Sequence, residues 1–159
     1  MGRLLKRVDE LGLRVPWIVR WHGRVPARRI DEQSLLSGTD YLPTLCAITG
    51  IKINAADFEG EDTSGAWLGR EAHVRTKPLL WKASSPGSEA LIREGQWKLR
   101  YPTRKKDGEV ELYDIIADPA EANNLTVKFP DIVKSLSKKI EAWVVSLPKQ
   151  YEKTDYKLD

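Results

Sequence analysis

Cysteine, histidine and long apolar stretches are scarce in this sequence of 159 residues. The single cysteine, Cys46, excludes an intramolecular disulfide, and the composition gives no sign of an oxidising compartment. The two histidines, His22 and His73, stand in polar loops without the neighbours that a metal site needs. No stretch approaches the ~20 apolar residues that cross a bilayer. We therefore expect no disulfide framework, no metal site and no membrane span.

A strong charge of either sign is also missing. The formal net charge is only +3, although 31% of the residues are charged. A nucleic-acid-binding protein normally concentrates a basic excess on one face. We therefore expect no nucleic-acid partner and interpret the basic runs 24–29 and 104–106 as solvated loops. The first residues contain no apolar run of signal-peptide length, so the chain as it stands is expected to be cytoplasmic.

The stretch from Glu89 to Asp118 shows the clearest structural pattern, because its apolar and polar residues alternate with the period of a strand. Gly95-Gln96 separates two alternating runs and predicts a two-residue hairpin. Pairing with a further strand would place Lys98 and Arg100 opposite Glu109 and Glu111 on a solvated side. The pattern predicts four antiparallel strands, at residues 78–82, 89–94, 97–101 and 109–115.

One long helix is predicted after this sheet, from Asp131 to Leu147, with Pro130 at its start and Pro148 at its end. Its apolar stripe would cover one face of the sheet. The stripe consists of Ile132, Leu136, Ile140, Trp143, Val144 and Leu147. The predicted fold class is therefore α+β, with a four-stranded antiparallel sheet packed against a C-terminal helix.

The N-terminal half shows a different pattern of apolar residues. Residues 2–12 and 39–49 have helical spacing, and in the second helix Leu42, Leu45, Cys46 and Thr49 share one face. Residues 15–21 are continuously apolar, which predicts a strand covered on both faces, as in an α/β sheet. The remaining residues of the chain are too few to cover such a strand on both sides.

The order of these motifs resembles the C-terminal part of type I, formylglycine-dependent sulfatases, such as arylsulfatases and N-acetylgalactosamine-6-sulfatases. The motifs are RVPWIVRWHG, TDYLPTL, ALIREGQWKLR and ELYDIIADPAEANNL, in that order. The resemblance implies that residues 1–75 are a remnant of the sulfatase α/β core, which is alkaline-phosphatase-like. It implies that residues 76–159 are the C-terminal subdomain.

The family's chemistry requires groups that this sequence does not contain. Sulfatases of this type use a formylglycine made within a C/S-x-P-x-R motif, and they hold Ca²⁺ with an Asp-Asn pair. Cys46 is followed by Ala47-Ile48-Thr49-Gly50 and fits no such motif. The metal-binding strand and the catalytic lysine would fall between Leu13 and Arg14, where they are missing. The resemblance therefore implies a catalytically incompetent chain without catalytic, cofactor-binding or metal-binding residues.

Other candidate site residues have simpler interpretations. Cys46 lies on the apolar face of a helix and is interpreted as a small buried hydrophobe. Asp114 and Asp118 stand at turn or cap positions. The acidic cluster, interpreted as a solvated loop, consists of Asp57, Glu59, Glu61 and Asp62.

Three functions stay open from the sequence. The chain is a non-catalytic sulfatase piece, a part of an active sulfatase that another polypeptide completes, or a module that binds an anionic partner such as a sulfated glycan. The half-covered N-terminal part predicts association through residues 15–49, with a second copy or with another polypeptide. We expect self-association before the alternative, because the C-terminal sheet already has its own helix.

Overall fold

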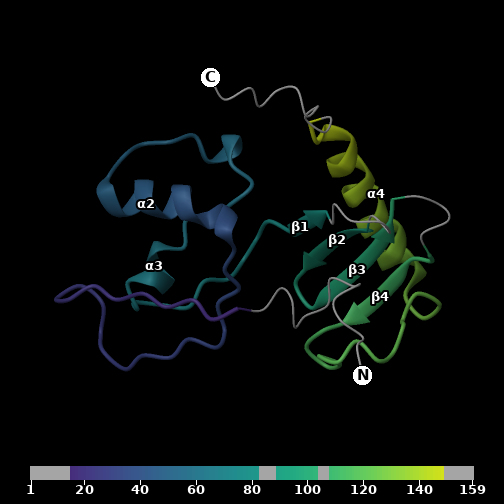
Figure 1. Cartoon of the computed structure of the whole chain (residues 1–159), viewed down its shortest axis with the longest axis horizontal. Helices are drawn as coiled ribbons and strands as arrows, with labels where there is room; N and C mark the ends of the chain where they lie inside the picture. Colours follow the sequence, from purple (N-terminus) through teal and green to yellow (C-terminus); the bar gives the residue numbers. More distant parts are fainter. Residues whose placement is uncertain (1–14, 83–88, 104–107, 149–159) are drawn as a thin grey trace, which may run out of the picture. The chain divides into compact units, whose positions relative to one another are not determined.

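The computed structural model describes residues 15–82, 89–103 and 108–148 (Figure 1). The chain forms two compact units, Met1–Leu79 and Leu80–Asp159. The helix expected at residues 2–12 lies outside the described residues. Within the described part, no helix is both long enough and apolar enough to cross a membrane.

The second unit is built on the expected sheet, in which neighbouring strands follow the order β1-β2-β3-β4. In the antiparallel register Ile92 lies opposite Leu99, and Leu99 lies opposite Leu112. Gly95 has a φ of 59° in the hairpin between β2 and β3, a conformation that favours glycine. The strands are β1 (Leu79–Lys82), β2 (Glu89–Glu94), β3 (Trp97–Pro102) and β4 (Glu111–Asp114).

Helix α4 (Pro130–Ser146) packs on one face of this sheet, as the sequence predicts. The core of the unit consists of Ala90, Ile92, Leu99, Leu112, Leu136 and Ile140. The predicted stripe is wrong at its C-terminal end, because Trp143 and Leu147 are only half-buried and lie outside this core. Val144 still packs against this core, while the C-terminal end of α4 extends past the strands (Figure 1).

The opposite face of the sheet corrects a second expectation, because Lys98 and Arg100 are buried rather than solvated. Arg100 does pair with Glu111 (2.9 Å), and it also pairs with Glu89 (2.7 Å). Lys98 pairs with Glu121 at 2.6 Å instead of with Glu109. The chain turns back after β4 and brings Glu121 onto this face, a return that period-two alternation cannot reveal.

In the described part of the first unit, short helices and 3₁₀ turns are joined by long irregular segments. Helix α2 (Tyr41–Thr49) ends at Gly50, whose φ is 77°, and α3 (Ser64–Trp67) is a single turn. Two 3₁₀ turns, η1 (Gly38–Asp40) and η2 (Ala55–Asp57), precede and follow α2. Residues 15–21 form no strand, which corrects the prediction. Their apolar pattern suits a strand, but a strand requires a neighbour for its backbone N–H and C=O groups.

The apolar face of α2 is only partly covered. Cys46 is buried, as expected, with 6% exposure. Leu42 and Leu45 share that face and are 54% and 40% exposed. An apolar face that the pattern marks as core is therefore open in this chain.

The packing of α4 makes a prediction about stability. Ile140→Ala should lower the free energy of unfolding by about 2–5 kcal/mol, because Ile140 is fully buried in the core. Val145→Ala is the control on the same helix, since Val145 is 85% exposed, and it should change stability by less than about 0.5 kcal/mol. Urea denaturation measures both values. Equal losses for the two variants would contradict the described helix orientation.

Candidate functional site

A buried carboxylate, Asp40, organises the polar centre of the first unit. Asp40 is fully buried at the start of α2 and accepts hydrogen bonds from the backbone N–H groups of Ser37 (2.7 Å) and Glu61 (3.0 Å). The guanidinium of Arg75 donates to the same carboxylate, and its Nε donates to the carbonyl of Leu35 at 3.0 Å. Asp40 therefore joins segments that are up to 35 residues apart.

Glu61 is the second carboxylate of this cluster. Its oxygens accept hydrogen bonds from His73 Nε2 (2.8 Å), the backbone N–H and hydroxyl of Thr76, and the backbone N–H of Lys77 (2.7 Å). Arg75 adds an ion pair at 3.7 Å. Burial alone would raise the pKa of Glu61, but these donors outweigh it and lower the pKa from 4.5 to about 2. Glu61 is therefore ionised at neutral pH, and these hydrogen bonds hold its carboxylate in place.

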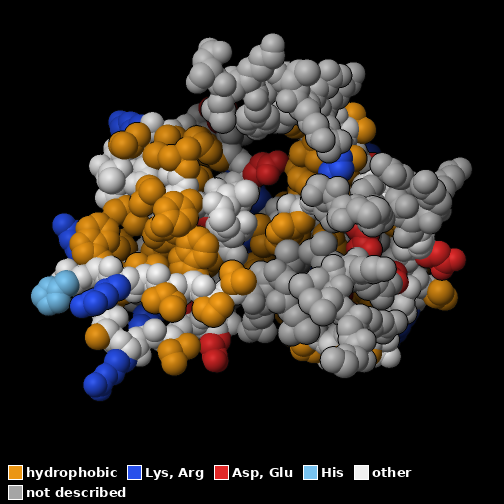
Figure 2. All heavy atoms as spheres, viewed as in Figure 1, with side chains coloured by type: hydrophobic (Ala, Val, Ile, Leu, Met, Phe, Trp, Pro, Cys, Tyr) orange, Lys and Arg blue, Asp and Glu red, His pale blue; other side chains and the backbone are white. Residues whose placement is uncertain are grey.

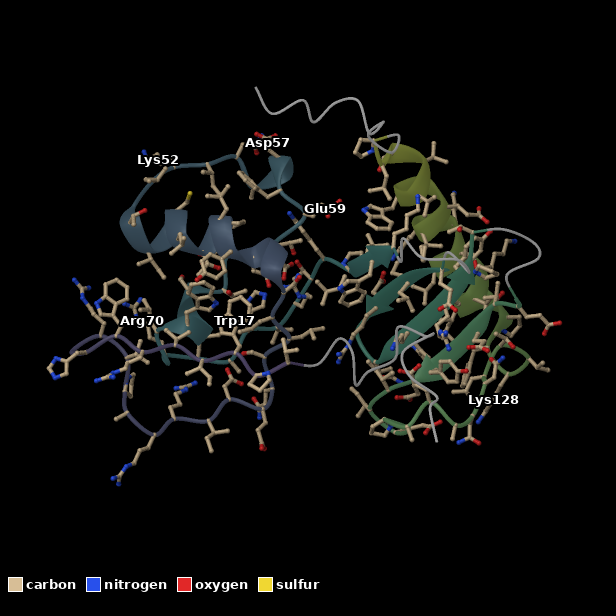
Figure 3. The ribbon with its side chains drawn as sticks, viewed as in Figure 1. Trp17, Lys52, Asp57, Glu59, Arg70 and Lys128 are labelled. Carbon is tan, nitrogen blue, oxygen red and sulfur yellow. The ribbon has the colours of Figure 1, made fainter. Side chains whose placement is uncertain are left out.

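The expectation of a solvated acidic loop is therefore correct for some members and wrong for one. Asp57, Glu59 and Asp62 are exposed, the first two visibly so in Figure 3. The side chain of Glu61 is only 9% exposed. Sequence spacing could not reveal this, because the donors to Glu61 come from residues 73–77.

Lys77 fixes the neighbouring loop. Its ammonium donates to the carbonyls of Ala55 (2.9 Å), Phe58 (2.6 Å) and Gly60 (3.3 Å). A side chain at Gly60 would collide with the backbone of Thr39, so this close approach requires glycine. The loop around Glu61 is therefore held from both sides.

A cavity of about 650 Å³ opens beside this cluster. Its floor is formed by α2 and the loop that follows it, and its polar rim includes Glu61, Asp62 and His73. The hydrogen bonds to Glu61 occupy its carboxylate, so it is poorly placed to act as a general base. Within the described ranges no group of three or more His, Cys, Asp or Glu side chains is arranged to hold a metal ion. The cluster is best explained as structural.

A second, smaller hollow of about 200 Å³ lies on the other side of the same unit. Trp21 and Arg24 contribute to it from the N-terminal segment, and Arg70 contributes from the residues after α3, where Figure 3 labels it. The Arg24 guanidinium lies 5.7 Å from the centroid of the Trp21 ring. The remaining lining residues are Ala47, Ile48, Ser64 and Leu68.

The other candidate residues have structural roles. Asp114 accepts hydrogen bonds from the N–H groups of Ile116 (3.1 Å) and Ala117 (3.0 Å), which confirms its turn position. Asp118 accepts from the N–H of Asn123 at 2.8 Å in the next turn. Cys46 is buried in α2, and His22 is exposed in a turn after residues 15–21. The sequence analysis did not identify Asp40 or Arg75, although Ser37 and Asp40 have the spacing of a capping box.

Residues 5–146 match the family model described as "N-sulphoglucosamine sulphohydrolase, C-terminal". The chain belongs to the sulfatase family. It is 27% identical over 146 residues to an N-acetylgalactosamine-6-O-sulfatase of Bacteroides thetaiotaomicron, covering 84% of this chain and 28% of that protein. It is 30% identical over 132 residues to arylsulfatase A of Bos taurus, covering 80% of this chain and 25% of that protein.

The fold agrees with this assignment. A solved 2-O GAG sulfatase superposes with a TM-score of 0.51 at 22% identity, over 71% of this chain and 27% of that one. The expectation of a sulfatase C-terminal sheet and helix, in the alkaline-phosphatase-like family of folds, is confirmed. The sulfatase chain described here spans about a quarter of the length of the curated relatives it matches.

The Glu61 cluster predicts a pH-dependent contribution to stability. Glu61→Gln should cost about 1–3 kcal/mol at neutral pH, because it replaces a charged acceptor that several donors share. The pKa of Glu61 is depressed on folding, so its stabilisation is complete above pH 4.5 and is lost as the pH falls toward 2. The stability gap between wild type and Glu61→Gln should therefore shrink over that range.

Urea denaturation at a series of pH values measures this gap. Glu32→Gln is the matched control, because Glu32 is exposed in the same unit. It should leave stability nearly unchanged. A gap that stays constant from pH 6 to pH 2 would contradict the assigned role of Glu61.

Proposed function

We propose that this chain acts as the non-catalytic C-terminal segment of a sulfatase and that it completes a catalytic α/β body supplied by another sulfatase segment. The observation that carries this proposal is the open apolar face of the first unit. Family membership supports it, and so does the fact that the relatives are about four times as long as the region they share with this chain.

The lack of catalytic groups supports the first half of the proposal. The family's nucleophile motif requires Cys or Ser, then Pro two positions later and Arg four positions later. Cys46 fails at both positions. Ser84 and Ser146 have the proline, but Ser88 and Gln150 stand where arginine is required. The polar cluster around Glu61 does not replace this chemistry, because its carboxylate is already saturated with donors.

The second half of the proposal depends on what we call the apolar face, which consists of Val15, Ile18, Tyr41, Leu42 and Leu45. These side chains are 40–88% exposed, and Ile18 is the most exposed of them. The rings of Trp17 and Tyr41, 5.8 Å apart, join the N-terminal segment to α2. Figure 2 shows hydrophobic side chains gathered over this unit. Exposed apolar patches of this kind mark interaction sites.

The preferred occupant of this face is the preceding part of a sulfatase rather than a second copy of this chain. Residues 15–21 have a strand-like sequence but no strand neighbour among the described residues, and of their carbonyls that of Trp21 is taken up by the turn that follows. The rest of this backbone suits pairing with a further strand. In the relatives, the matched region belongs to a chain with most of its residues elsewhere, which could supply both that strand neighbour and the apolar cover. This argument reverses the preference for self-association drawn from the sequence alone.

The first test is catalytic. The purified chain, incubated with calcium and an aryl sulfate, should release no product, because the family's nucleophile motif is absent. Arylsulfatase A of Bos taurus serves as the positive control. Calcium-dependent turnover that a single substitution within this chain abolishes would contradict the proposal.

The second test is association. Mixed with the part of the Bacteroides relative that precedes the matched region, the chain should sediment as a one-to-one complex. Leu45→Glu should weaken the complex at least tenfold, because it places a charge in the apolar face. Val127→Glu is the control, since Val127 is 93% exposed in the second unit. A homodimer that Leu45→Glu dissociates, with no mixed complex, would assign the face to a second copy instead.

A further inference from the structure

We propose that Asn124 accepts an N-linked glycan when the chain enters a secretory pathway that carries out this modification. Asn124-Leu125-Thr126 has the acceptor pattern Asn-x-Ser/Thr, with a residue other than proline in the middle. The other asparagines, Asn54 and Asn123, have no serine or threonine two positions later. The site shares no residue with the apolar face, so it does not depend on the proposed function. It departs from the expectation of a cytoplasmic chain, which the first residues alone suggested.

The local structure holds the Asn124 carboxamide in one orientation. Its Oδ1 accepts hydrogen bonds from the backbone N–H of Leu112 (3.2 Å) and from the backbone N–H of Thr126 (3.1 Å). The second bond closes an Asx turn, in which an asparagine side chain folds back over the backbone two residues later. Because Oδ1 accepts both bonds, Nδ2 is the branch of the carboxamide that is left for a reaction. No hydrogen bond among the described residues uses this nitrogen.

The burial of the three residues suits an acceptor site. Leu125 packs against the core of the second unit and anchors the loop. Asn124, which precedes it, is exposed, and Thr126, which follows it, is half-buried. The Asx turn brings Thr126 next to the carboxamide, and residue 126 is the position where the acceptor pattern requires a hydroxyl group. The folded loop therefore presents the amide and the hydroxyl together.

The adjacent asparagine is held differently. The backbone N–H and the Nδ2 of Asn123 both donate to Asp118 Oδ2, at 2.8 Å and 3.1 Å. The amide nitrogen of Asn123 is thus part of the turn after β4. Asn123 therefore provides a neighbouring amide that neither fits the pattern nor offers its nitrogen.

The modification forms one bond and breaks one. Nδ2 of Asn124 attacks the anomeric carbon of an oligosaccharide carried on a polyprenyl diphosphate, the co-reactant that the pathway supplies. The new bond from Nδ2 to this carbon replaces the carbon–oxygen bond to the diphosphate, which leaves with the electron pair, and Nδ2 gives up one proton. Nothing is oxidised or reduced. Oδ1 remains an acceptor in the product, so the bonds from Leu112 and Thr126 are compatible with the glycan.

The glycan would stand at one edge of the sheet. β4 is the last strand in the order, and Leu112 within it already donates to Asn124 and accepts from the N–H of Leu125 at 2.8 Å. A hydrated oligosaccharide on Asn124 would shield the rest of this edge. Since open sheet edges pair with strands of other chains, the glycan would oppose aggregation through β4.

Secretion of the whole chain from mammalian cells, directed by an added signal peptide, tests the site. We expect the chain to gain a glycan that peptide N-glycosidase F removes, leaving aspartate at position 124, which peptide mass spectrometry locates. Asn124→Asp should abolish the glycan while keeping the oxygen that accepts from Leu112 and Thr126. Thr126→Ala should also abolish it, whereas Thr126→Ser should retain it.

Asn123→Gln is the matched control and should leave the glycan in place. A chain that gains no glycan would overturn the proposal, and so would a glycan that persists in Asn124→Asp or Thr126→Ala. Translation into microsomes gives the same readout before export, so a variant that folds poorly is still scored. The test uses neither turnover nor a second polypeptide, so its failure is distinct from a failure of the proposed function.

Discussion

The fully buried carboxylate of Asp40 is the constraint on which the first unit depends. It must be neutralised because a buried charge without a partner is costly, and Arg75 with the surrounding N–H groups meets this need. Arg75 also pairs with Glu61, which in turn positions residues 73–77. The described part of this unit has no sheet of its own. Its segments are therefore joined by this polar network of hydrogen bonds and ion pairs rather than by a strand ladder.

The second unit is organised by a covered sheet rather than by a buried carboxylate. Its sheet has α4 on one face and the buried ion pairs of Lys98 and Arg100 on the other, so each of its layers is covered within the unit. The first unit leaves Leu42 and Leu45 open, although their spacing is that of a buried face. The open apolar helix face is therefore a feature of the first unit.

Sequence patterns predicted what depends on near neighbours. Alternation at Trp97–Tyr101 and helical spacing at Leu136 and Ile140 were sufficient for the hairpin, the sheet and α4. They failed where distant residues decide the outcome: Lys98 is buried by a returning segment, and Glu61 is held by donors 12 to 16 residues later. The strand predicted at 15–21 failed for a different reason, because a strand exists only with a neighbour, and none of the described residues supplies one.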